Sequence, residues 1–341
     1  MFTRRKIVVP ENTAIYIEGH LAEMRKSMKY LGLTIDRNWK FNDHFDRIIP
    51  KAVGMAASLM RLMPNLRGPE ERRRRLYANT VNSVIMYGAP IWADAITKNR
   101  FIRENLRRIQ RCVSLRVISA YRTVSHEAAA VLARQIPLDI LAQEHARVYN
   151  RTCAAREKGL VLTDRQRSGL RNMERAESVS EWKRRLEEGA DRLPGATARE
   201  CVVPILSEWI NKRKGLGVTF RVTQVVTGHG CFNLYLYNID RADSPVCAHC
   251  GSGMDTAGHT LLECSSWATQ REQLYATFDR DFTLKSIFGD CVAEPSKWAT
   301  FRNFCERTIK EKERQERERQ RAAGTVRRAR PPRARIRLLK R

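Results

Sequence analysis

Apolar residues are spaced differently along successive parts of the chain, and this spacing predicts which elements form. In residues 1–40, two short runs, Thr13–Ile17 and Lys29–Ile35, alternate apolar with polar positions or concentrate β-forming residues, which is typical of strands. From residue 41 to about 158, apolar positions recur every three or four residues, which is the helical period. The pattern predicts a small β segment, too small to stand alone, followed by an all-helical bundle over 41–158.

The spacing changes again after residue 158. Residues 159–198 are polar and mix arginine with glutamate, so we expect a linker that holds one helix at about 178–190. Apolar positions return in 199–305, where a helix is predicted first. The stretch 216–238 fits either period, and its glycines favour two short helices beside a cluster of cysteines.

Residues 306–341 are dominated by charge. As far as Arg321 they pair glutamate with arginine or lysine at helical spacing without an apolar stripe, which indicates a solvated single helix. From Gly324 the sequence is rich in arginine and is interrupted by Pro331-Pro332, so we expect it to be disordered until it binds a partner. The predicted fold class is therefore mainly α, with a small N-terminal β segment, a helical bundle, a cysteine-containing module and a basic tail.

The net charge narrows the function. The chain has 63 Lys and Arg against 37 Asp and Glu, a formal net charge of +26, in 341 residues, which allow about two or three domains. Such an excess favours a polyanionic partner, and phosphate backbones are the usual one. A soluble basic protein and a basic scaffold for acidic proteins are the alternatives. No apolar run approaches the roughly 20 residues of a membrane helix, and Ile7–Val9 is too short for a signal peptide, so we expect an intracellular protein without a membrane partner.

Four residues have the spacing of a metal site, Cys247-x2-Cys250-x8-His259-x4-Cys264. Three thiolates and one imidazole form a tetrahedral set suited to Zn²⁺, and four protein ligands leave no open position, which predicts a structural role. The nine cysteines are odd in number, so a disulfide framework is not expected. His249 lies inside the first pair as a competing ligand, and a chance grouping is the alternative. A knuckle of this kind commonly contacts single-stranded nucleic acid.

Arginine-rich runs supply candidate contacts to phosphate. They lie in two predicted helices and in the tail: Arg72, Arg73, Arg74, Arg75, Arg107, Arg108, Arg327, Arg328, Arg330, Arg333, Arg335 and Arg337. Arginines in a disordered tail contact the backbone without reading sequence. The tail is also compatible with nuclear import, so we expect a nuclear location, and a solvated charge run is the alternative.

Further motifs follow one another in a fixed order. They are Tyr30-Leu31-Gly32 after a strand, the stretch Trp39–Ala52, Tyr87-Gly-Ala-Pro-Ile-Trp92, and Gln224–Leu236 just before the cysteines. Over about residues 10–300 this series resembles the C-terminal part of the Pol polyprotein of non-LTR, LINE-type retrotransposons. Within that family it is most similar to the arthropod type-1 (R-one) group, which inserts into ribosomal RNA genes.

The resemblance implies a division of the chain and a function for the intact parent. It implies the end of a reverse transcriptase palm at 1–40, a thumb-like domain at 41–158, a linker at 159–198, a zinc-knuckle module at 199–305, and a charged helix with an Arg-rich tail at 306–341. Tyr30, Leu31 and Gly32 would form the primer-grip-like site. The parent would be an RNA-directed DNA polymerase with an endonuclease, and its partners would be element RNA and target DNA.

The catalytic residues of such a parent are missing from this sequence. No Asp-Asp pair of the polymerase loop occurs, so Mg²⁺ would serve only the missing polymerase core, and no catalytic residue is predicted in this chain. We therefore expect a fragment or a degenerate copy that contributes binding to primer, template or target. The competing hypothesis is a stand-alone, non-enzymatic, zinc-dependent RNA- or DNA-binding protein.

Overall fold

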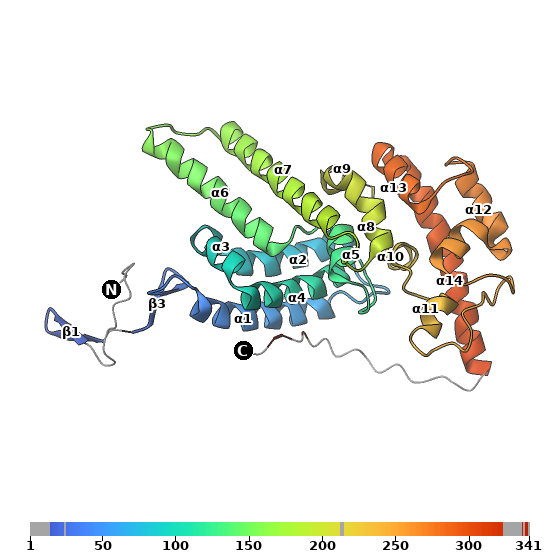
Figure 1. The fold of residues 1–341 in the computed structure, drawn as a ribbon, viewed down its shortest axis with the longest axis horizontal. Coiled ribbons are helices and arrows are strands. Elements are labelled where there is room, and N and C mark those ends of the chain that lie inside the picture. The colour runs from blue at the N-terminus through green and yellow to red at the C-terminus, as the bar shows by residue number, and fades with distance from the viewer. Residues whose placement is uncertain (1–13, 24, 212–214, 323–335, 337, 340–341) are drawn as a thin grey trace.

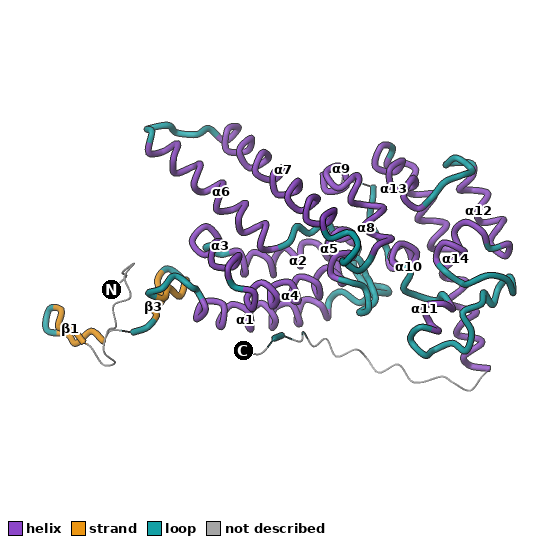
Figure 2. Tube along the Cα trace, viewed as in Figure 1, coloured by secondary structure: helices purple, strands orange, loops and turns teal. Residues whose placement is uncertain are grey.

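The protein is mainly helical, as predicted. The computed structural model describes all residues except 1–13, 24, 212–214, 323–335, 337 and 340–341. Two β hairpins lie at one end of an elongated molecule, a helical bundle forms its middle, and the cysteine-containing module lies at the other end (Figures 1 and 2).

The predicted β segment consists of two antiparallel hairpins. One pairs β1 (Ala14–Ile17) with β2 (His20–Glu23), and the other pairs β3 (Ser27–Tyr30) with β4 (Leu33–Asp36). The second hairpin turns on two residues with positive φ, Leu31 at 45° and Gly32 at 85°. Two such residues match the twist of the flanking strands, so the turn is tight and exposed.

The bundle predicted over 41–158 contains six helices. They are α1 (Asn42–Arg61), α2 (Glu71–Met86), α3 (Ala89–Lys98), α4 (Arg100–Val117), α5 (His126–Ala133) and α6 (Leu138–Glu157). Asp36 joins β4 to α1, because its carboxylate accepts the backbone N–H groups of Asn38, Lys40 and Phe41 at 3.0, 3.2 and 2.6 Å. The rings of Phe45 and Trp92 meet edge to face in the core, 5.2 Å apart.

The segment expected to be a linker contains a longer helix than predicted. Helix α7 (Asp164–Glu188) starts at Thr163, which forms a capping box with Gln166. It runs beside α6, and together they form an arm that extends from the bundle (Figure 1). The last ten residues of α7 pack Val179, Trp182 and Leu186 into the core, whereas most positions nearer the tip of the arm are exposed.

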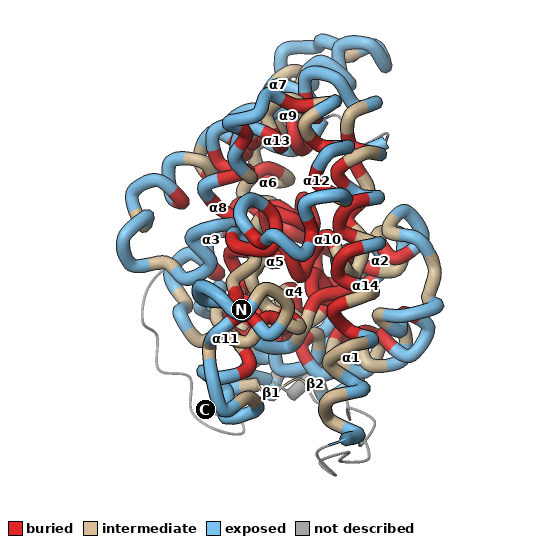
Figure 3. Tube along the Cα trace, turned by 90° about the vertical axis from the view of Figure 1, so that its right-hand side faces the viewer, coloured by how far each residue is buried: buried red, intermediate tan, exposed pale blue. Residues whose placement is uncertain are grey.

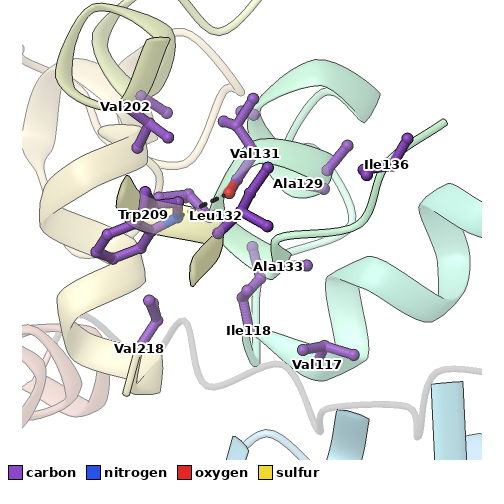
Figure 4. Close-up of a cluster of buried hydrophobic side chains, with 14 of the residues drawn as sticks. Val117, Ile118, Ala129, Val131, Leu132, Ala133, Ile136, Val202, Trp209 and Val218 are labelled. Carbon is purple, nitrogen blue, oxygen red and sulfur yellow. Dashed lines mark hydrogen bonds between the residues drawn. The ribbon is translucent and has the colours of Figure 1, made fainter. Parts of the chain in front are cut away.

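Short helices follow the arm. They are α8 (Ala196–Val202), η1 (Val203–Ile205), α9 (Leu206–Asn211), α10 (Phe220–Thr227) and α11 (Asn233–Tyr237), so the two short helices predicted over 216–238 are present. Trp209 points from α9 towards α5, where its indole N–H donates to the carbonyl of Val131 at 3.0 Å (Figure 4). One continuous hydrophobic core therefore joins the bundle to the helices after the arm.

The module at the far end contains the remaining elements. They are the π-helical turn η2 (His259–Glu263), η3 (Ser265–Trp267), α12 (Ala268–Tyr275), α13 (Leu284–Ala293), η4 (Pro295–Lys297) and α14 (Trp298–Ala322). Buried positions gather along α4, α5, α10 and α14 (Figure 3).

The charged helix differs from the solvated helix predicted from residue 306. It begins at Trp298, and its inner face carries buried Phe304, Ile309 and Lys312. The last described residues also lie on the body, because the backbone N–H of Leu339 donates to Asn105 Oδ1 on α4 at 2.7 Å. Buried apolar side chains and Lys312 therefore hold α14 on the body of the protein, although its composition suggested full exposure.

Candidate metal centre and nucleic-acid-binding surfaces

The four residues predicted to bind metal come together. One ligand atom from each of Cys247, Cys250, His259 and Cys264 lies within 4.8 Å of the others. Cys250 Sγ is 3.3 Å from His259 Nε2, and Cys247 Sγ is 3.9 Å from Cys264 Sγ. A set of three sulfurs and one nitrogen with this compactness is compatible with a structural metal ion such as zinc.

Tight backbone turns bring these ligands together. The carbonyl of Cys247 accepts the N–H of Gly251 at 2.9 Å, and its own N–H donates to the carbonyl of Gly253 at 3.0 Å. Gly251 and Gly253 have φ values of 71° and 69°, which strain residues with a Cβ. The N–H of Cys264 closes the η2 turn onto the carbonyl of His259 at 2.8 Å.

Neighbouring groups orient the imidazole of His259 and favour the thiolate form of Cys250. Glu263 Oε2 lies 3.3 Å from His259 Nδ1, so it can accept the Nδ1 proton and leave Nε2 facing the cysteines. Hydrogen bonds from the side chain and backbone of Ser252 lower the pKa of Cys250 to about 6. Burial raises the pKa of Cys264 to about 11, which makes its thiolate form unfavourable, and a bound cation would offset this effect.

The competing ligand His249 is turned away from the cluster. Its ring packs on Trp267 with the centroids 5.1 Å apart. Burial lowers its pKa to about 4, so the ring is neutral at physiological pH. The cluster found among the described residues therefore has the predicted four members and omits His249.

A buried ion pair ties the metal cluster to α14. Lys312 Nζ is 2.7 Å from Asp255 Oδ1, and the two residues are 0% and 1% exposed. The other oxygen of Asp255 accepts the N–H of Asn233 at the start of α11 at 2.9 Å. Sequence reasoning missed this pair, because nothing local distinguishes Lys312 from the exposed cations around it.

The two motifs assigned to palm and thumb by resemblance are in contact. The hydroxyl of Tyr87 donates to the carbonyl of Leu31 at 2.8 Å. A Cβ on Gly32 would lie 3.1 Å from the Tyr87 ring, so glycine allows this close approach. Trp92 holds the other side of the motif, because its indole N–H donates to the carbonyl of Tyr87 at 2.9 Å. Tyr30 and Leu31 remain exposed at the turn.

The predicted arginine contacts occupy different environments. Arg72 and Arg73 are exposed on α2. Arg74 is buried, and its guanidinium donates to four backbone carbonyls, including those of Met63 and Arg116 at 3.2 and 2.9 Å. This guanidinium holds the bundle together and is not available to phosphate.

The remaining arginines predicted to bind phosphate either pair with glutamates, are half-buried, or lie outside the part of the chain that the structure describes. Arg75 pairs with Glu71, Arg107 lies 2.5 Å from Glu127, and Arg108 is half-buried. The tail residues lie outside the described part of the chain: Arg327, Arg328, Arg330, Arg333, Arg335 and Arg337. Among the described residues, no helix has the length and apolar character needed to cross a membrane.

Comparison with known proteins identifies relatives. The chain is 28% identical over 256 residues to a retrovirus-related Pol polyprotein from the type-1 retrotransposable element R1 of Nasonia vitripennis, covering 73% of this chain and 72% of that protein. A putative 115 kDa protein of the type-1 retrotransposable element R1DM of Drosophila melanogaster is 26% identical over 259 residues, 72% of this chain and 24% of that protein. The Pol polyprotein of element R1 4 of Nasonia vitripennis is 26% identical over 303 residues, 86% of this chain and 74% of that protein.

The chain spans about three quarters of the two Nasonia relatives and about a quarter of the Drosophila one. No family model matches the chain, and no solved structure matches it significantly. The relatives confirm the resemblance predicted from the motifs: the chain is related to the Pol polyproteins of type-1 retrotransposable elements of the R1 group of arthropods.

Proposed function

We propose that this chain is the nucleic-acid-holding part of an R1-type Pol polyprotein and that it carries a structural zinc ion. The observation that carries the proposal is the Cys3His cluster, whose ligand atoms lie within 4.8 Å of one another in a chain with a net charge of +26. A zinc knuckle on a strongly basic body is typical of proteins that bind single-stranded nucleic acid. The polymerase and endonuclease steps belong to the intact parent.

Each surface has a proposed role. Tyr30, Leu31 and Gly32, supported by Tyr87, would position the primer strand. The exposed arginines of α2 and the basic positions of α4 would follow the duplex backbone as a thumb does. The zinc knuckle would hold a single-stranded or target segment, and the Arg-rich tail would add contacts to phosphate and direct the protein to the nucleus.

Metal analysis tests the zinc site. Purified protein should contain about one zinc ion per chain, and His259→Gln should reduce this content because Gln does not replace the imidazole nitrogen. His249→Gln is the matched control, because His249 packs on Trp267 outside the cluster and its loss should leave the metal in place. Equal zinc loss in both variants, or no zinc in the wild type, would contradict the assignment.

Oligonucleotide binding tests the function. We expect fluorescence anisotropy to show binding to labelled single-stranded RNA, single-stranded DNA and duplex DNA. The logarithm of the association constant should fall linearly with the logarithm of the salt concentration. RNA against DNA preference is read from the same titrations. Absence of affinity for all three probes in dilute buffer would end the proposal.

A further inference from the structure

A groove opens on the flank of the arm, where α6 and α7 leave the bundle. Its volume is about 570 Å³, within the range of about 300–1,000 Å³ that holds small organic ligands. It is lined by Pro90 at the start of α3, by the aliphatic Val148 of α6, and by polar or aromatic residues of α6 and α7, among them Tyr149 and Arg171. None of the predicted site residues that the structure describes lines it.

The groove is lined by Glu144, one of whose carboxylate oxygens accepts no hydrogen bond from the described residues. Glu144 is 5% exposed, and its Oε1 pairs with Arg175 at 2.9 Å. Its Oε2 is buried and has no hydrogen-bond partner among the described residues. A buried acceptor without a partner is costly, about 1–3 kcal/mol, and a ligand that donates an N–H group would satisfy it.

The walls supply the other groups that a nucleotide requires. Tyr149 is 55% exposed, so part of its ring is open to a stacking partner. Arg171 and Asn172 are exposed at the rim, where they can reach a phosphate or a sugar hydroxyl. Burial lowers the pKa of His145, so its neutral ring can act as a donor or an acceptor.

The charge of the arm favours the same kind of ligand. The stretch 149–175 holds seven arginine or lysine residues against three acidic ones. Two of these cations, Arg151 and Arg175, pair with glutamates near the base of the arm. The other five are exposed; Arg171 lies at the groove and the remaining four lie nearer the tip of the arm, where they would attract a phosphate backbone.

We propose that this groove binds one nucleotide of a single-stranded nucleic acid. Its base stacks on the Tyr149 ring and donates an N–H group to Glu144 Oε2, and its phosphate contacts Arg171 and Asn172. The site is distinct from the metal cluster and from the β3–β4 turn. The inference rests on the proposed nucleic-acid-binding function and assigns part of that binding to the arm.

Photo-crosslinking of the full chain tests the site directly. Single-stranded RNA and DNA that contain 5-iodocytidine or its deoxy form, which crosslink to nearby aromatic rings, are irradiated in complex with the protein, and the adduct is mapped by mass spectrometry. We expect an adduct on Tyr149. Tyr149→Ala should abolish that adduct and weaken oligonucleotide binding about five-fold or more, whereas Tyr149→Phe should preserve the affinity because it keeps the stacking surface.

A charge-matched pair separates a local contact from general electrostatics. Arg171→Gln should weaken binding, whereas Arg184→Gln should not, although both remove one exposed cation from α7; Arg184 pairs with Glu181 and Glu188 away from the groove. If wild-type protein binds but adducts form only outside residues 144–175, or the two variants bind equally, the groove site is refuted and the proposed function stands. If wild-type protein binds no oligonucleotide, both fail.

Discussion

Replacing Lys312 with methionine should destabilise the module that holds the metal cluster. Methionine keeps an unbranched apolar stem, but it leaves Asp255, which is 1% exposed, as a buried carboxylate without its cation. Removing one partner of a buried ion pair costs about 3–5 kcal/mol. Asp255 would retain hydrogen bonds from the Asn233 N–H at 2.9 Å and from Thr260 Oγ1 at 3.4 Å. We therefore expect the lower end, about 3 kcal/mol in the free energy of unfolding.

Urea titration and hydrogen exchange measure this effect at two levels. Urea unfolding followed by tryptophan fluorescence gives the loss in free energy. Hydrogen exchange followed by mass spectrometry locates it, and we expect faster exchange in α11, α14 and the metal-binding turns while α1 to α4 stay protected. The double variant Lys312→Met with Asp255→Asn should recover part of the loss, because no charge is then left buried without a partner.

Lys310→Met is the matched control. Lys310 is exposed on the same helix, two positions earlier, so this variant changes the net charge equally without breaking the buried pair. Its effect should stay within about 0.5 kcal/mol. If Lys312→Met is as stable as Lys310→Met, the ion pair does not join α14 to the metal cluster, and the reasoning from burial is refuted.

Removing zinc with a chelator should speed hydrogen exchange across residues 245–268 and leave the bundle protected. Unchanged exchange of residues 245–268 after chelation would contradict a structural metal. Deleting residues 322–341 should make the salt dependence of oligonucleotide binding less steep, as salt titrations of anisotropy would show. Burial lowers the pKa of His126 to about 4, below an unfolded value of about 6.5. The contribution of the neutral ring to the free energy of unfolding is therefore fully present above about pH 6.5 and is lost as the pH drops towards 4, and His126→Leu should flatten this fall in urea titrations. Tyr87→Phe should cost about 0.5–1.5 kcal/mol and loosen the β3–β4 turn, measured by its hydrogen exchange.

The metal cluster was predictable because its signal is local. Cys247 and Cys250 lie in one turn, and His259 and Cys264 lie in another, so residue type and spacing carry nearly all of the geometry. The helical period of residues 41–158 was similarly informative, because each helix buries a regular face. The contact between Tyr87 and Leu31 was not predictable from spacing, since 56 residues separate its partners.

The arm and the buried lysine show where sequence patterns fail. The buried apolar residues of α7 lie only in its last ten positions, so the rest of the helix resembled a polar linker, although Thr163 and Gln166 carried a usable capping signal. In the run from Lys310 to Arg314 every position has the composition of a solvated helix. Lys312 is buried only because Asp255, 57 residues away, lies opposite it, and no local pattern reports such a partner.

The net charge overstates the number of cations that can bind phosphate. A count of basic residues treats every cation as available to phosphate, but several are used inside the protein. Arg74 donates to four carbonyls, Arg134 donates to the carbonyls of Trp209 and Leu216, and Arg271 donates to those of Leu261 and Cys264. In a helix each residue is rotated by about 100° from the last, so the run of four arginines in α2 cannot present all of its side chains to one ligand. Position on the folded surface therefore decides which cations can bind nucleic acid, and the length of a basic run does not.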